Sequence, residues 1–84
     1  MSEQTHNRMH LNNLLQEMYP HREPSPEYRA KGPQRDDNGK IFWEIYVFIE
    51  TVPYGAGHGR TKDIARERAA GATIGLLLGN GGMN

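Results

Sequence analysis

A glycine-rich segment followed by basic residues is the part of this sequence whose residue types most clearly suggest chemistry. Gly55, Gly57 and Gly59 alternate along the chain and lead directly into Arg60-Thr61-Lys62 and an alanine-rich stretch. Glycine lets a ligand approach the backbone closely at positive φ, and the amide groups at the start of a helix favour an anion. The segment therefore predicts a phosphate-binding turn that enters a helix.

The predicted helix runs from about Lys62 to Leu78, with Thr61 as its N-cap. Lys62 and Arg66 are four residues apart and so share one face beside the helix start. Asp63, in the same turn, interacts favourably with the helix dipole but opposes a bound phosphate. We therefore expect a moderate affinity for a phosphate-containing partner and a shallow dependence of that affinity on salt.

Two further patterns indicate the elements that position this turn. Apolar residues at i, i+3, i+4 and i+7 within residues 11–18 predict a short helix that ends near Pro20. Strands are expected at about 27–31, 40–50 and 54–56, the first one stopped by Gly32-Pro33. A long polar loop at 35–40, expected to be mobile, separates the first two strands.

The order helix, strand, strand, strand, helix indicates an α+β fold, with a three-stranded antiparallel sheet and both helices packed on one face. We expect one domain at 9–78, a flexible segment at 1–8 and a flexible glycine-rich tail at 79–84. Small residues in the last helix, such as Ala65, should let it sit close to the sheet. The expected core residues are Leu14, Leu15, Met18, Trp43, Ile45 and Ala69.

Composition restricts the classes of function. The 84 residues carry no cysteine and a net charge of zero, so nucleic-acid binding would depend on clustered charge. His6 and His10 have the spacing of a metal pair, but no third ligand lies near them in the sequence. No serine or threonine lies beside a recognisable histidine and carboxylate. We expect no enzyme activity, cofactor, metal, membrane span or small-molecule substrate, and an intracellular location.

Several separate motifs together resemble the double-stranded RNA-binding domain (dsRBD) family. They are LLQE from Leu14, PEY from Pro26, Gly32-Pro33, IFWEIYV from Ile41 and GHGRTKDIARERAA from Gly57. In order and spacing they cover about residues 11–78, which is nearly the whole chain. The resemblance implies recognition of A-form duplex RNA by its shape, 2′-hydroxyls and phosphates, without sequence specificity.

The resemblance also implies which residues contact the RNA. In that family the first helix lies in one minor groove and the first loop in the next. The start of the last helix binds phosphates across the major groove between them. The implied RNA-binding residues are Asn13, Gln16 and Glu17, then Gly32, Pro33 and Arg35, and finally Gly59, Arg60, Thr61, Lys62 and Arg66.

Three departures from the family pattern keep an alternative open. Arg35 stands where histidine is more common, Asp63 replaces a lysine, and the first loop, with Asp36-Asp37, is about two residues longer. The alternative is a degenerate dsRBD that binds another protein or itself, with weak or no RNA binding. Its contact surface would be apolar and would comprise Phe42, Tyr46, Phe48 and the run Leu76-Leu77-Leu78.

Overall fold

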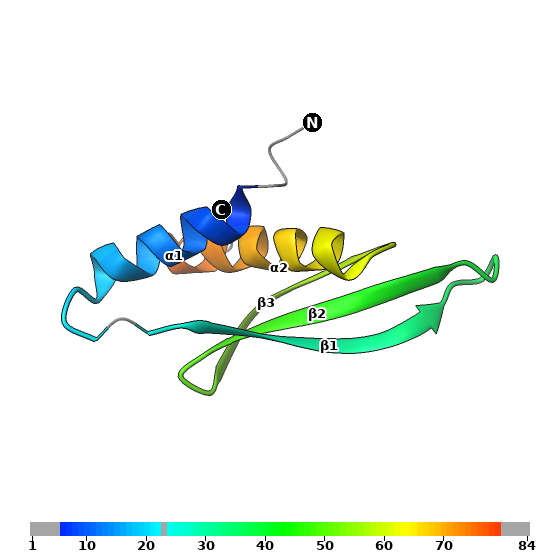
Figure 1. Cartoon of the computed structure of the whole chain (residues 1–84), viewed down its shortest axis with the longest axis horizontal. Helices are drawn as coiled ribbons and strands as arrows, with labels where there is room; N and C mark the ends of the chain where they lie inside the picture. Colours follow the sequence, from blue (N-terminus) through cyan, green and yellow to red (C-terminus); the bar gives the residue numbers. More distant parts are fainter. Residues whose placement is uncertain (1–5, 23, 80–84) are drawn as a thin grey trace.

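The computed structural model describes residues 6–22 and 24–79. Its elements are α1 (Asn7–Met18), β1 (Pro26–Arg35), β2 (Ile41–Ile49), β3 (Val52–Gly59) and α2 (Lys62–Leu77). The strands form one antiparallel sheet in the order β1-β2-β3, and both helices lie over the same face of it (Figure 1). The predicted α-β-β-β-α fold is confirmed. In the described part of the chain, neither helix combines the length and apolar character that a membrane crossing requires.

The helix α2 packs directly on the sheet through small side chains. Ala65, Ala69 and Ala70 are completely buried, as expected for a helix that approaches a strand closely. They share the core with Leu11 and Leu15 of α1, and with Ile45, Val47 and Ile49 of β2. The apolar stripe of the first helix was therefore predicted correctly in its centre, although Leu14 is only half-buried.

Two apolar residues at the ends of elements are exposed. Met18, predicted to be in the core, is 40% exposed because α1 ends there, and the next residue, Tyr19, packs against the core. Ile41 is 45% exposed because β2 begins beyond the start of α2 (Figure 1). At both element ends the repeating apolar pattern continues in the sequence, but the element that would cover it does not.

The alternating glycines lie in a strand and not in the predicted turn between strand and helix. They belong to β3, which continues to Gly59, and among the described glycines the positive φ angles are at Gly32, Gly39 and Gly79. A Cβ atom on Gly57 would lie 2.4 Å from the backbone nitrogen of Ala69. The corresponding atom on Gly55 would lie 2.5 Å from the backbone nitrogen of Thr73. The glycines therefore make room for α2, and the prediction of positive φ at Gly57 and Gly59 was wrong.

The hairpin between β1 and β2 is longer than expected, and its tip is a hydrogen-bonded turn. Gly32-Pro33 does not end β1 but forms an irregularity within it, between the pairs that Lys31 and Gln34 make with β2. The strand continues to Arg35, and the tip is a compact turn. There, Oδ1 of Asp36 accepts hydrogen bonds from the backbone nitrogens of Asn38 and Lys40, each at 2.9 Å. The aspartate thus stabilises the turn, in agreement with the usual role of such residues.

The start of α1 is fixed by α2. Glu67 is only 4% exposed, and its Oε1 accepts a hydrogen bond of 2.8 Å from the backbone nitrogen of Asn7. The side-chain nitrogen of Asn7 donates in return to the backbone oxygen of Glu67, at 2.9 Å. This tertiary cap lets the helix begin at Asn7, within the segment 1–8 predicted to be flexible. Residues 1–5 of that segment and 80–84 of the predicted tail lie outside the described residues.

Candidate nucleic-acid interface

The start of α2 is capped as predicted. The hydroxyl oxygen of Thr61 accepts a hydrogen bond of 3.1 Å from the backbone nitrogen of Ile64, and Thr61 has the extended conformation of an N-cap. This bond satisfies one of the amide groups that the first helical turn leaves without an intrahelical partner. Thr61 and Lys62 are both exposed, so the positive end of the helix dipole faces solvent beside a lysine.

Lys62 is positioned by an aromatic ring. Its Nζ lies 4.7 Å from the ring centroid of Trp43 on β2, within the range of a cation–π interaction. Trp43 in turn is paired across the sheet with Gly59, the last residue of β3. The ammonium group is therefore held where the sheet meets the helix start, and it remains exposed.

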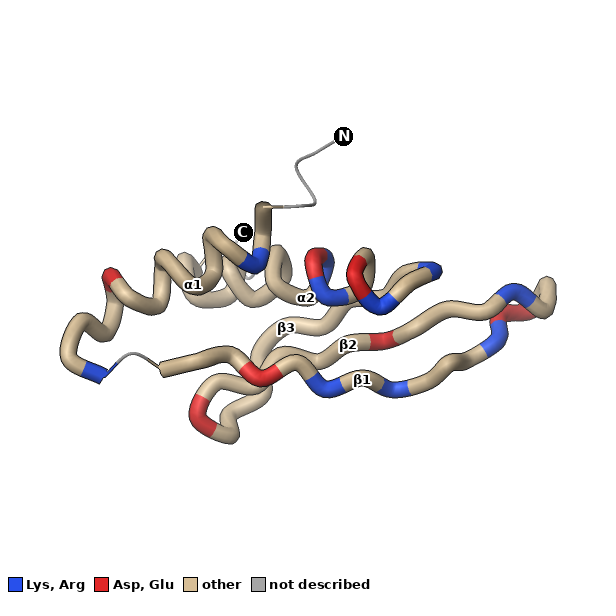
Figure 2. Tube along the Cα trace, viewed as in Figure 1, with Lys and Arg blue, Asp and Glu red and all other residues tan. Residues whose placement is uncertain are grey.

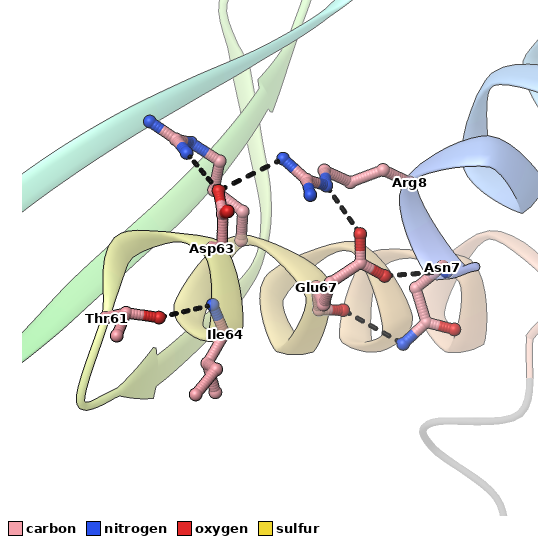
Figure 3. A network of polar contacts seen from close by, with 7 residues as sticks. Asn7, Arg8, Thr61, Asp63, Ile64 and Glu67 are labelled. Carbon is pink, nitrogen blue, oxygen red and sulfur yellow. Dashed lines mark hydrogen bonds and ion pairs between the residues drawn. The ribbon is translucent and has the colours of Figure 1, made fainter. Parts of the chain in front are cut away.

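Arg66 takes part in a network that the sequence patterns did not reveal. Its NH1 lies 2.8 Å from Oδ1 of Asp63, and the NH1 of Arg8, on α1, lies 3.8 Å from the same oxygen. The Nε of Arg8 donates to Oε2 of Glu67 at 2.5 Å (Figure 3). The hydrogen bond to Glu67 is the main cause of a raised pKa of the Arg8 guanidinium. The carboxylate of Asp63 thus partly neutralises the charge of two arginines. The contacts of Arg8 connect α1 to the start of α2.

Arg8 and Glu67 could not have been paired from the sequence, because they are 59 positions apart in the chain. In the sequence pattern of its own helix, each of the two looks like a solvent-exposed charged residue. The only sequence signal was the position of Glu67 one residue after Arg66, which places it near the same helix start. The structure shows that its carboxylate is buried against α1 and has a structural role.

Arg60 connects the start of α2 with the hairpin. Its NH1 lies 3.7 Å from Oδ2 of Asp36 and 3.5 Å from the backbone oxygen of Ile41. Arg35, at the end of β1, donates from NH1 to the backbone oxygen of Gly39 at 3.0 Å, across the turn. Arg35 and Arg60 were both predicted to bind RNA. The structure holds both side chains at the hairpin tip.

The other predicted contact residues lie apart from this centre. Asn13, Gln16 and Glu17 are exposed on the later half of α1. Gly32 and Pro33 are exposed on β1 and lie in the strand, so their expected place in the loop is corrected. Gly59 is buried, with a hypothetical Cβ 2.5 Å from Cγ2 of Ile64, and its predicted phosphate contact remains a prediction.

These groups form a row along the molecule. In Figure 1 the start of α2 lies between the later half of α1 and the tip of the β1–β2 hairpin, along the longest dimension of 45 Å. Basic and acidic positions lie close together at the helix start and at the hairpin tip (Figure 2). The arrangement can therefore present three separated polar regions to one extended partner, with its positive charge partly compensated by Asp63 and Asp36.

Residues 6–22 and 24–79 contain no group of three histidine, aspartate or glutamate side chains arranged to hold a metal ion. The chain matches no model of a known protein family, and no curated protein matches it significantly.

Proposed function

We propose that this chain is a dsRBD-like module that binds duplex RNA without sequence specificity. The observation that carries the proposal is the row of three polar regions, with the capped start of α2 and its Lys62 and Arg66 in the middle. An A-form duplex presents a minor groove, a band of phosphates and a second minor groove in the same order. A row of this kind suits a partner that is recognised by its shape.

Each region would have its own chemical task. Asn13, Gln16 and Glu17 would meet one minor groove, where the carboxylate of Glu17 can accept a hydrogen bond from a 2′-hydroxyl. Such a bond would favour RNA, because DNA lacks that hydroxyl. Lys62 and Arg66 would bind phosphates together with the exposed amide groups of the helix start. The hairpin tip, with Arg35, would approach the second minor groove.

Asp63 makes the proposed interaction weaker than a fully basic helix would allow. A phosphate approaching Arg66 must compete with a carboxylate already 2.8 Å away. Exposed ion pairs of this kind contribute about 0.2 to 1 kcal/mol, so the competition lowers the affinity without preventing binding. We therefore expect fewer counterions to be released than the number of basic residues suggests, and a shallow salt dependence.

A protein-binding function is the second candidate, and exposed leucines favour it. Leu76 and Leu78 at the end of α2 are 49% and 56% exposed. On the predicted aromatic sheet face, Tyr46 is 37% exposed, whereas Phe42 and Phe48 are half-buried. The guanidinium of Arg29 lies 3.9 Å from the ring centroid of Phe48 and covers it. Self-association or docking would therefore use the end of α2 more readily than the aromatic face.

The proposal can be tested by titrating RNA and DNA duplexes of about 20 base pairs, longer than the footprint of roughly 16. Binding to RNA only, weaker at the higher of two salt concentrations, is the expected result. Lys62→Ala should lower the affinity and reduce the salt slope by about one. Lys31→Ala is the matched control, because Lys31 is exposed on β1 outside the proposed row. RNA binding absent at both salts would contradict the proposal and favour the protein-binding candidate.

A further inference from the structure

An open cleft lies beside β2 and β3, and its lining includes Arg68 of α2. Its volume is about 590 Å³, within the range of small-ligand sites. It is bounded by β2, β3, the turn into α2 and the hairpin tip. The residues that give it its chemistry are Asp36, Phe42, Glu44, His58, Arg60 and Arg68.

Two rings form the aromatic part of the cleft. Phe42 on β2 and His58 on β3 have ring centroids 6.0 Å apart and an interplanar angle of 72°, an edge-to-face arrangement. Phe42 is half-buried and His58 is exposed, so both rings retain surface that a planar ligand can cover. Aromatic side chains are the usual platforms for unpaired nucleobases, because every base has a π-face.

Two guanidinium groups form the cationic part. The NH1 of Arg68 donates to the backbone oxygen of His58 at 3.0 Å, which holds this α2 side chain over β3. The NH1 of Arg60 is held by the contacts with Ile41 and Asp36 described above. A guanidinium carries five N–H donors, and these contacts use one terminal nitrogen of each arginine. Both arginines can therefore still bind a phosphate while their orientation is fixed.

Glu44 supplies an acceptor in the lining of the cleft. Its Oε1 accepts hydrogen bonds from Nε2 of Gln34 at 2.7 Å and from the hydroxyl of Tyr46 at 3.4 Å. A carboxylate has about four acceptor positions, so capacity remains for a ligand donor. Carboxylates accept from the amino group of cytosine but find no such donor on uracil.

We propose that this cleft binds a single unpaired nucleotide next to the duplex, with its base on Phe42 and His58 and its phosphate on Arg60 and Arg68. The inference rests on the proposed function, and it extends the ligand from a plain duplex to one with a single-stranded end. Arg60 belongs both to the proposed duplex interface and to the cleft. A strand leaving the duplex near the hairpin tip can therefore reach the cleft directly.

The cleft is tested first with mononucleotides, which need no duplex. Cytidine 5′-monophosphate is titrated into isotope-labelled protein, and the backbone amide signals of His58 and Gly59 are followed by NMR. Saturable shifts in the millimolar range are expected, with weaker binding of uridine 5′-monophosphate. Phe42→Ala and Arg68→Gln should each remove most of the binding. Phe48→Ala is the matched control, because it deletes the same ring from the same face of β2 outside the cleft.

The second measurement compares a blunt RNA duplex with the same duplex carrying a two-cytidine 3′ overhang. The overhang should tighten binding at least about five-fold, and Phe42→Ala should abolish this gain without changing the affinity for the blunt duplex. The absence of mononucleotide shifts, or shifts that survive both cleft variants, would overturn the inference. So would shifts with an acidic peptide but with no nucleotide. Failure of the blunt duplex to bind would instead contradict the proposed function, and the mononucleotide result would still decide on the cleft.

Discussion

Replacement of Gly57 by alanine tests why glycines alternate along β3. The added Cβ would lie 2.4 Å from the backbone nitrogen of Ala69 and 2.7 Å from the backbone carbon of Arg68. Ordinary contacts begin near 3.4 Å, so α2 and β3 would have to separate by about 1 Å. No side-chain rotation can relieve a clash with helix backbone.

The expected cost follows from the packing of the core. Overfilling a close-packed interior typically costs about 1 to 3 kcal/mol, and we expect the upper part of this range because a whole helix must move. Small domains have total stabilities of about 5 to 15 kcal/mol, so this is a large fraction. The melting temperature should fall by roughly 10 °C or more, at about 4 to 8 °C for each kcal/mol.

Urea unfolding followed by the fluorescence of Trp43, the single tryptophan, gives the free energy of unfolding directly. Gly75→Ala is the matched control, since nothing lies within 4 Å of its hypothetical Cβ. Within a helix this change should stabilise the protein by up to about 1 kcal/mol. If Gly57→Ala kept its stability within about 0.5 kcal/mol and lost RNA affinity, our packing argument would be refuted in favour of a phosphate-binding turn.

Three further predictions concern charged and polar side chains. Asp63→Asn should raise the affinity for duplex RNA about two- to five-fold at low salt, because Arg66 loses its partner. Thermal melts of this variant should show a free energy of unfolding lower by about 0.3 to 1 kcal/mol, because the helix start loses a favourable negative charge. Arg8→Ala should cost about 1 to 3 kcal/mol in urea unfolding, less than for a fully buried pair, since Arg8 is 39% exposed. The free energy of unfolding lost on Arg8→Ala should be smaller in a Glu67→Gln background. An equal loss there would exclude coupling between Arg8 and Glu67. Burial raises the pKa of the Tyr28 hydroxyl, which is buried with no hydrogen-bond partner among the described residues. The contribution of Tyr28 to the free energy of unfolding is then fully present below a pH of about 10, the pKa of tyrosine in the unfolded chain. The contribution falls as the pH rises above this value, because the hydroxyl ionises first in the unfolded chain. Tyr28→Phe should reduce this fall, and an unchanged pH profile would show that the hydroxyl is not its source.

Local patterns were sufficient to predict the order and type of the elements. A period of two in β2, an apolar stripe in α1 and the capping residue Thr61 each report the conformation of a few neighbouring residues. The alanines of α2 also indicated a close approach to the sheet, which the burial of Ala65 and Ala69 confirms. These features depend on backbone geometry and on one neighbouring surface, and both leave a repeating signature in the sequence.

The same patterns could not distinguish a ligand-binding glycine from a packing glycine. Gly57 is compatible with either role until Ala69 is placed 12 positions later on the helix above it. The contacts of Arg8 with Glu67 and of Arg60 with Asp36 were hidden for the same reason. Each joins segments that are far apart in the chain, and their distance depends on how α1, α2 and the hairpin pack. The candidate residues could therefore be named from the sequence. Their contact partners, the neutralisation of nearby arginines by Asp63 and the cleft beside them could be recognised only in the folded structure.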